Sequence, residues 1–295
     1  MIKKQILWNA SITPFDKSGN KIDYNSLKNC IELQQKSKNG ILLLGSTGEN
    51  LSLSDNEKKK IIEYVCNLNI KLDIIVGVPS YNLNTTLDWI NFCNEFPIDG
   101  YLITTPIYTK PGIIGQTLWF EKVLNKSKFP SMLYNIPSRA GIELYKETVK
   151  NLKDHNNFVA IKESSGSIEN IISYKMIAPD ISIFCGDDYM MPYMALEGSA
   201  GLVSVASNIW PSATRKYVKY SLNRSNKIKS GIWWQACKSL FIASNPIPIK
   251  TIMQKTGIIK NNTVRLPLSN IDLKSDDIII KFDKIIKNWN LENES

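Results

Sequence analysis

The sequence predicts an α/β fold: a (β/α)8 barrel with a C-terminal helical appendix. Eight short apolar runs recur up to residue 205, and a segment with helical periodicity follows each of them. Each run has the length of a parallel strand that is buried on both faces. Eight strand–helix units are the number that closes into a barrel, and about 225 residues is a comfortable size for one.

The apolar runs give the predicted strands: residues 6–12, 40–44, 72–77, 100–104, 131–134, 158–162, 181–185 and 201–205. Between the first two, Leu27, Ile31 and Leu33 recur at helical spacing. A doubly wound open sheet is the alternative, but no GxGxxG motif follows the first run to favour it. We therefore predict a closed sheet.

The pattern changes after about residue 223. Residues 227–243, 247–256 and 275–288 are predicted to be helices without strands between them. Breaks at Asn245-Pro246 and Leu266-Pro267 separate these segments. We therefore predict two units, a catalytic barrel at 1–224 and a helical domain at 225–295.

The composition limits the chemistry. The 295 residues are 43% hydrophobic and 21% charged, as in ordinary globular proteins. The single histidine excludes a His-rich metal centre, and a Ser-His-Asp arrangement would rest entirely on His155. Because His155 lies in a polar connection, we expect a solvated loop residue. Proton chemistry must then come from Lys, Tyr, hydroxyl or carboxylate side chains.

The positive charge does not indicate a nucleic-acid site. Of 36 basic residues only four are arginines, and the densest run is Lys58-Lys59-Lys60 on a predicted helix. Nucleic-acid sites usually show clustered Lys and Arg with aromatic residues between them. We therefore expect a solvated basic surface and no nucleic-acid partner.

Cysteine spacing and hydropathy indicate a cytoplasmic protein. The five cysteines are well separated and form no CxxC pair, which favours reduced and mostly buried thiols. No apolar run approaches the roughly 18 to 20 residues of a membrane span. Asn9 and Asp16 interrupt the apolar stretch behind the basic residues 1–5, so we expect no signal peptide and no membrane partner.

Polar residues follow the predicted strands at the end where barrels carry their active sites. Lys162 closes the sixth run, so its amine is expected to face the central pocket. Burial favours a neutral amine, which can attack a carbonyl to form a Schiff base. The alternative is an ion pair with a buried carboxylate, although Glu163 points to the other face of the strand.

Hydroxyl groups gather at the same predicted rim. Tyr108 and Tyr134 lie at neighbouring strand ends, and Ser46 and Thr47 follow the second strand. Such hydroxyls can relay protons without a histidine, although each tyrosine alone could equally be a packing residue. Arg139 follows a proline in a loop, where it could bind a carboxylate or form a structural ion pair.

Five motifs occur together: GSTGE at 45–49, TPIY at 105–108, YNIPSRAG at 134–141, IKESSG at 161–166 and GDD at 186–188. With them the chain resembles the dihydrodipicolinate synthase and N-acetylneuraminate lyase family of lysine-dependent class I aldolases. The resemblance runs from ITPF at 12–15 to NPIPIK at 245–250 and RLP at 265–267.

Within that family, the arginine of YNIPSRAG is typical of synthases. The resemblance therefore implies a lyase that joins pyruvate to L-aspartate 4-semialdehyde in lysine and diaminopimelate biosynthesis. One alternative is another pyruvate-dependent aldolase, such as an N-acetylneuraminate or keto-deoxy-sugar acid lyase. A non-catalytic basic binding protein is a more distant one.

The resemblance also implies residue roles. Lys162 would form the Schiff base with pyruvate and Tyr134 would be the general acid/base. Ser46 and Tyr108 would complete the relay, Tyr108 from across a tight dimer interface within a homotetramer. The implied substrate-binding residues are Thr47, Arg139, Gly186 and Val203. No cofactor and no metal are implied.

Three departures from the family pattern stand out. Ser46 replaces the usual Thr, which keeps the hydroxyl but loses the methyl group that restrains its rotamer. Ile107 stands where bacterial synthases often have Tyr. The region of the lysine-feedback site differs as well, with Asn50, Leu51, Asp55 and Lys58. We therefore expect no inhibition by lysine.

Overall fold

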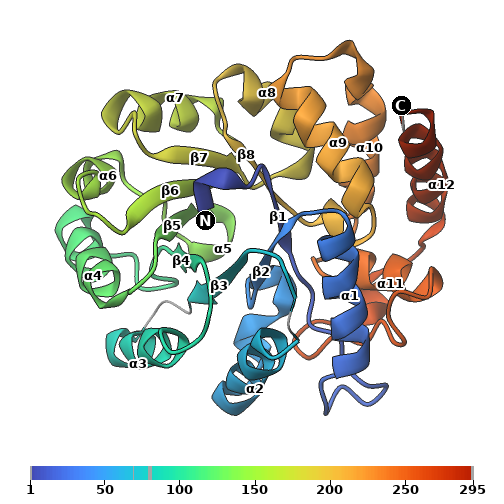
Figure 1. Cartoon of the computed structure of the whole chain (residues 1–295), viewed down its shortest axis with the longest axis horizontal. Coiled ribbons are helices and arrows are strands. Elements are labelled where there is room, and N and C mark those ends of the chain that lie inside the picture. The colour runs from blue at the N-terminus through green and yellow to red at the C-terminus, as the bar shows by residue number, and fades with distance from the viewer. Residues whose placement is uncertain (1, 69, 79–81, 294–295) are drawn as a thin grey trace.

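Eight parallel strands close into a barrel, because β8 pairs with β1. The computed structural model describes residues 2–68, 70–78 and 82–293 (Figure 1). The strands are β1 Leu7–Ala10, β2 Gly40–Leu43, β3 Ile74–Val78, β4 Gly100–Thr104, β5 Ser131–Asn135, β6 Phe158–Glu163, β7 Ser182–Cys185 and β8 Gly201–Ser204. Each end lies within two residues of its prediction, and closure excludes the open sheet.

Helices surround this TIM barrel, one or more after each strand (Figure 1). They are α1 Tyr24–Lys36, α2 Asp55–Cys66, α3 Leu83–Cys93, α4 Ile113–Lys126, α6 Lys146–Leu152, α7 Ile168–Ile177, α8 Met191–Leu196 and α9 Pro211–Leu222. A further single turn, α5 Pro137–Ala140, follows β5. Polar side chains cap the first turn of several of these helices. At the start of α2, for example, Ser54 forms a capping box with Glu57.

The strands are apolar on both faces because each face packs against a different layer. Outward-facing residues contact the helices, and inward-facing residues fill the barrel. Trp8 fills part of this interior, and a Cβ at Gly40 would lie 2.5 Å from its indole ring. Glycine at position 40 therefore leaves room for the Trp8 side chain next to β2.

Three helices follow the barrel: α10 Ser230–Ser239, α11 Ile247–Lys255 and α12 Asp277–Glu292. In Figure 1, α12 lies along the outside of α9 and α10, which it contacts. Trp233 of α10 stacks on Tyr217 of α9 at 4.2 Å and contacts Trp289 of α12 at 5.1 Å between ring centroids. The helical segments agree with the predicted ones, and the domain boundary at 224/225 stays a prediction.

His155 lies at the end of the barrel where strands begin, away from the predicted site. It precedes β6, its Nε2 lies 3.0 Å from Asn125 Oδ1, and its Nδ1 accepts a hydrogen bond from the backbone N–H of Asn157. Its side chain therefore organises a turn, and it is half-buried rather than freely solvated.

The burial of the cysteines and of one lysine run can be compared with the predictions. Four cysteines are buried and Cys66 is half-buried. Lys59 and Lys60 are exposed on α2, but Lys58 is buried and its amine lies 3.0 Å from Asp55. The prediction of a solvated side chain was wrong for Lys58 because helical periodicity turns this position toward the protein. Across the described ranges, we find no helix whose length and apolar character would let it cross a membrane.

Candidate active site

Lys162 lies near the carboxyl end of β6, in register with Tyr134 of β5 and Phe184 of β7. Its side chain is 5% exposed, and Nζ lies 4.1 Å from the centroid of the Tyr134 ring. Glu163 points away and accepts hydrogen bonds from Asn135 Nδ2 at 2.7 Å and from a backbone N–H. Within the described residues Lys162 forms no ion pair with a carboxylate, so the buried amine faces the Tyr134 ring.

Gly186 follows β7 and lies directly against Lys162. A Cβ at this position would be 2.9 Å from Cε of Lys162 and 1.7 Å from Oγ of Ser164. The lack of a side chain is therefore what lets this backbone lie beside the amine. The next residue, Asp187, contributes charge: burial raises its pKa to about 6, while the nearby Lys162 ammonium acts in the opposite direction.

A cavity of about 360 Å³ opens at the carboxyl ends of β2 to β5. Its volume is in the range of small-molecule sites. Of the predicted site residues, Ser46, Tyr134 and Arg139 line it, whereas Lys162, Thr47, Gly186 and Val203 are not among its lining residues. Sequence reasoning did not assign several other lining residues, including Asn50, Ser52, Ile107, Asn245 and Leu268.

Arg139 lies in α5 rather than in the predicted loop. Pro137 occupies the first turn, where its fixed φ suits a helix, and Gly141 ends the turn with φ 76°. The Arg139 side chain is exposed at the rim of the cavity. This places a guanidinium where a carboxylate entering from solvent would meet it.

The loop after β2 has an unusual backbone. Leu44 and Glu49 are left-handed, with φ 57° and 53°, and between them η2 Ser46–Gly48 is a single 3-10 turn. Non-glycine residues hold this conformation only where their surroundings enforce it. Here Asn245 Nδ2 donates to Thr47 Oγ1 at 2.9 Å. Since Thr47 accepts this bond, its own hydroxyl proton stays available for a ligand.

A buried ion pair anchors the end of this loop. Glu49 accepts hydrogen bonds from Lys250 Nζ and, at 2.9 Å, from the backbone N–H of Arg265. The side chains of Glu49 and Lys250 are 1% and 0% exposed. Lys250 also donates to the Thr263 carbonyl at 2.9 Å and lies 4.2 Å from the Phe15 ring centroid. The C-terminal segment therefore holds the loop that carries Ser46 and Thr47.

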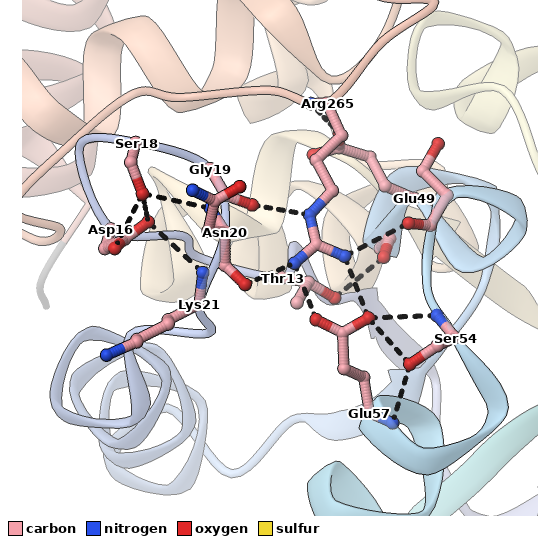
Figure 2. A network of polar contacts seen from close by, with 12 residues as sticks. Thr13, Asp16, Ser18, Gly19, Asn20, Lys21, Glu49, Ser54, Glu57 and Arg265 are labelled. Carbon is pink, nitrogen blue, oxygen red and sulfur yellow. Dashed lines mark hydrogen bonds and ion pairs between the residues drawn. The ribbon is translucent and has the colours of Figure 1, made fainter.

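The Arg265 side chain extends this anchor to α2 and the N-terminal loop (Figure 2). Its guanidinium donates to both oxygens of Glu57, at 2.9 and 2.6 Å, and to the carbonyls of Gly19 and Ser52. These hydrogen bonds are the main reason that the pKa of Glu57 falls to about 2. We call Glu49, Glu57, Lys250 and Arg265 the clamp.

The remaining predicted residues lie elsewhere. Val203 is buried inside the barrel in the same apolar cluster as Tyr134. Tyr108 is 91% exposed and outside the cavity; it has φ 68°, and its N–H donates to the Ala140 carbonyl. One chain by itself therefore brings Ser46, Tyr134 and Lys162 to one end of the barrel but leaves Tyr108 in solvent.

Nearly the whole chain matches one family of known proteins. The model of the dihydrodipicolinate synthetase family covers residues 3–288. The chain belongs to this family. The resemblance seen in the motifs is thereby confirmed.

Individual members of the family are similar over nearly their full length. The chain is 54% identical to the 4-hydroxy-tetrahydrodipicolinate synthase of Wolbachia pipientis subsp. Culex pipiens, covering 98% of both chains. It is 44% identical to the synthase of the same name from Chlamydia abortus, covering 96% of this chain and 97% of that one. The dihydrodipicolinate synthase from Aquifex aeolicus superposes with a TM-score of 0.88 at 29% identity, covering 99% of this chain and 100% of that one.

Proposed function

We propose that this member of the dihydrodipicolinate synthetase family condenses pyruvate with L-aspartate 4-semialdehyde, the reaction of 4-hydroxy-tetrahydrodipicolinate synthase, through a Schiff base on Lys162. The observation that carries the proposal is the buried Lys162 amine against the Tyr134 ring, at the end of the barrel where a cavity opens. The names and full-length similarity of the relatives support the same reaction.

The proposed first half-reaction binds pyruvate at Lys162. The Thr47 hydroxyl and nearby backbone N–H groups hold the pyruvate carboxylate. The neutral amine adds to the keto carbon, and a proton passes from the nitrogen to the former carbonyl oxygen to give the carbinolamine. A second proton then lets this oxygen leave as water while the nitrogen lone pair forms the C=N bond. Tyr134, in a relay with Ser46, moves the protons.

The proposed second half-reaction joins the two substrates. Loss of a proton from the pyruvyl methyl group gives an enamine. Its carbon attacks the aldehyde carbon of the semialdehyde, the C=O double bond opens, and the aldehyde oxygen takes a proton to become a hydroxyl. Arg139 holds the carboxylate of this second substrate with its two parallel donors. The substrate amine then closes the ring on the imine carbon and releases Lys162.

Trapping of the Schiff base tests this function. Borohydride reduces the imine to a stable secondary amine, so incubation with pyruvate followed by peptide mass measurement should locate a pyruvyl adduct on Lys162. The Lys162→Ala variant is the control and should gain no mass. An adduct on another lysine, or none on the wild type, would refute the mechanism.

We also propose that Tyr108 acts in the site of a second copy, within a homotetramer built from tight dimers in the cytoplasm. Its large aromatic side chain is 91% exposed on a left-handed backbone, which supports a role at a contact with a second copy. Mixing Tyr108→Phe and Lys162→Ala subunits should restore activity, because about a quarter of the sites in random dimers would then be intact. Activity no greater than the sum of the two variants would contradict a shared site.

The role of Arg139 has its own test. Arg139→Ala should raise the KM for the semialdehyde while leaving pyruvyl adduct formation largely intact, because only the second substrate needs the guanidinium. Steady-state kinetics with each substrate varied in turn, together with trapping, separate the two steps. Equal loss of both would contradict the assignment.

A further inference from the structure

Ser164 is a buried hydroxyl beside Lys162 that the proposed mechanism does not use. It follows β6 two residues after Lys162, so the alternation of a strand directs both side chains to the same face. Ser164 is 6% exposed, and its backbone N–H donates to the Asn135 carbonyl at 2.9 Å. Its position is therefore held by the backbone and not by its own side chain.

The Ser164 hydroxyl and the Lys162 side chain both lie next to Gly186. A Cβ built on Gly186 would be 1.7 Å from Ser164 Oγ and 2.9 Å from Lys162 Cε. Both atoms therefore border the small space that this glycine leaves open. The hydroxyl oxygen is a close neighbour of the carbon that bears the reactive amine.

Ser164 Oγ has no hydrogen-bond partner among the described residues. A buried hydroxyl without a partner is unfavourable and calls for an explanation, such as a ligand or a catalytic step that uses it. The neighbouring Ser165 shows the ordinary case: its Oγ accepts from the Ser167 N–H at 3.2 Å and from Asn170 Nδ2 at 3.0 Å. Two adjacent serines therefore differ, and only the one next to the amine is unpaired.

We propose that the Ser164 hydroxyl is a further catalytic group, which hydrogen-bonds the reacting atoms at Lys162 during Schiff-base formation. The inference rests on the proposed function, because it needs a keto acid to react at this amine. The hydroxyl accepts a hydrogen bond from an N–H of the amine and directs the nitrogen lone pair toward the keto carbon. It later donates to the carbinolamine oxygen as the C–O bond breaks and water leaves, so Ser164 itself gains and loses no proton overall.

The test compares two buried, unpaired serines. Ser131 is 0% exposed and its Oγ also lacks a partner in the described part of the chain, but it begins β5 at the far end of the barrel. Ser164→Ala and Ser131→Ala therefore remove the same unpaired group from two buried positions. Rapid-quench borohydride trapping gives the rate of pyruvyl adduct formation, and thermal unfolding reports on folding.

Ser164→Ala should slow adduct formation about 5- to 10-fold, the worth of one hydrogen bond, without lowering the thermal midpoint. Ser131→Ala should form the adduct at the wild-type rate. Wild-type rates in Ser164→Ala would overturn the inference, as would equal slowing in both variants. A wild type that forms no adduct would instead refute the proposed function itself.

Discussion

The strongest prediction concerns the ion pair of Lys250 and Glu49. Lys250→Met keeps the length and apolar stem of the side chain but removes the ammonium that faces Glu49. The two side chains are 0% and 1% exposed, so solvent cannot replace the lost partner. Removing one partner of a buried pair costs about 3 to 5 kcal/mol. Since whole domains are stable by only about 5 to 15 kcal/mol, the loss would be large.

The double variant Glu49→Gln/Lys250→Met gives the decisive comparison. It removes both charges together, so no uncompensated carboxylate stays buried, and we expect it to regain about 2 kcal/mol or more relative to Lys250→Met. Urea unfolding of the wild type, both single variants and the double variant completes the cycle. The exposed pair of Lys229 and Glu292, with 51% and 60% exposure, supplies the control: Lys229→Met should cost about 0 to 1 kcal/mol.

Additive effects would refute this reasoning. If the coupling in the cycle is below about 0.5 kcal/mol, the two charges do not depend on one another and the clamp does not hold the loop electrostatically. The folded double variant should still show weaker pyruvate binding, because the backbone of Ser46 and Thr47 loses an anchor. An unchanged pyruvate KM would show that the clamp stabilises the fold but does not affect pyruvate binding.

Three further predictions follow from the site. Gly186→Ala should abolish pyruvyl adduct formation in a folded protein, since the new Cβ would lie 1.7 Å from Ser164 Oγ; trapping at wild-type level would contradict it. Arg265 lowers the pKa of Glu57 to about 2, well below the ordinary value of this carboxyl, so the unfolded state binds more protons between the two values and stability should fall as pH falls through that range. Urea midpoints against pH should show a shallower fall for Glu57→Gln, and identical slopes would count against this pair. Added L-lysine should leave the initial rate unchanged, and inhibition would show that the altered region still binds lysine.

The barrel could be predicted from the sequence because a parallel strand that is buried on both faces has a continuous apolar sequence. This pattern is local, so strand ends such as 100–104 were predicted without error and the others within two residues. The same logic placed Lys162, since a lysine that closes an apolar run stands at the rim of the barrel. Motif resemblance added the family, which the full-length match confirms.

The sequence did not predict how the C-terminal segment reaches the site. Asn245 contacts Thr47, and Lys250 contacts Glu49, across 198 and 201 residues of chain. The motifs that contain these residues were visible, but no periodicity links positions so far apart. Only the folded chain shows that the NPIPIK and RLP segments anchor the loop after β2.

The sequence by itself therefore determined the strand order and the family, and it singled out Lys162 as the candidate for the reactive amine, because each of these depends on local pattern or on motif order. The tertiary structure decided three other points. Tyr108 is exposed to solvent, and Glu49 forms a buried ion pair with Lys250 although the two are far apart in sequence. The hydroxyl of Ser164 has no hydrogen-bond partner among the described residues and lies beside Lys162. The first two depend on distances between segments that are remote in sequence, and the third depends on which groups the folded barrel brings next to Ser164 Oγ; both are set only after the barrel has closed.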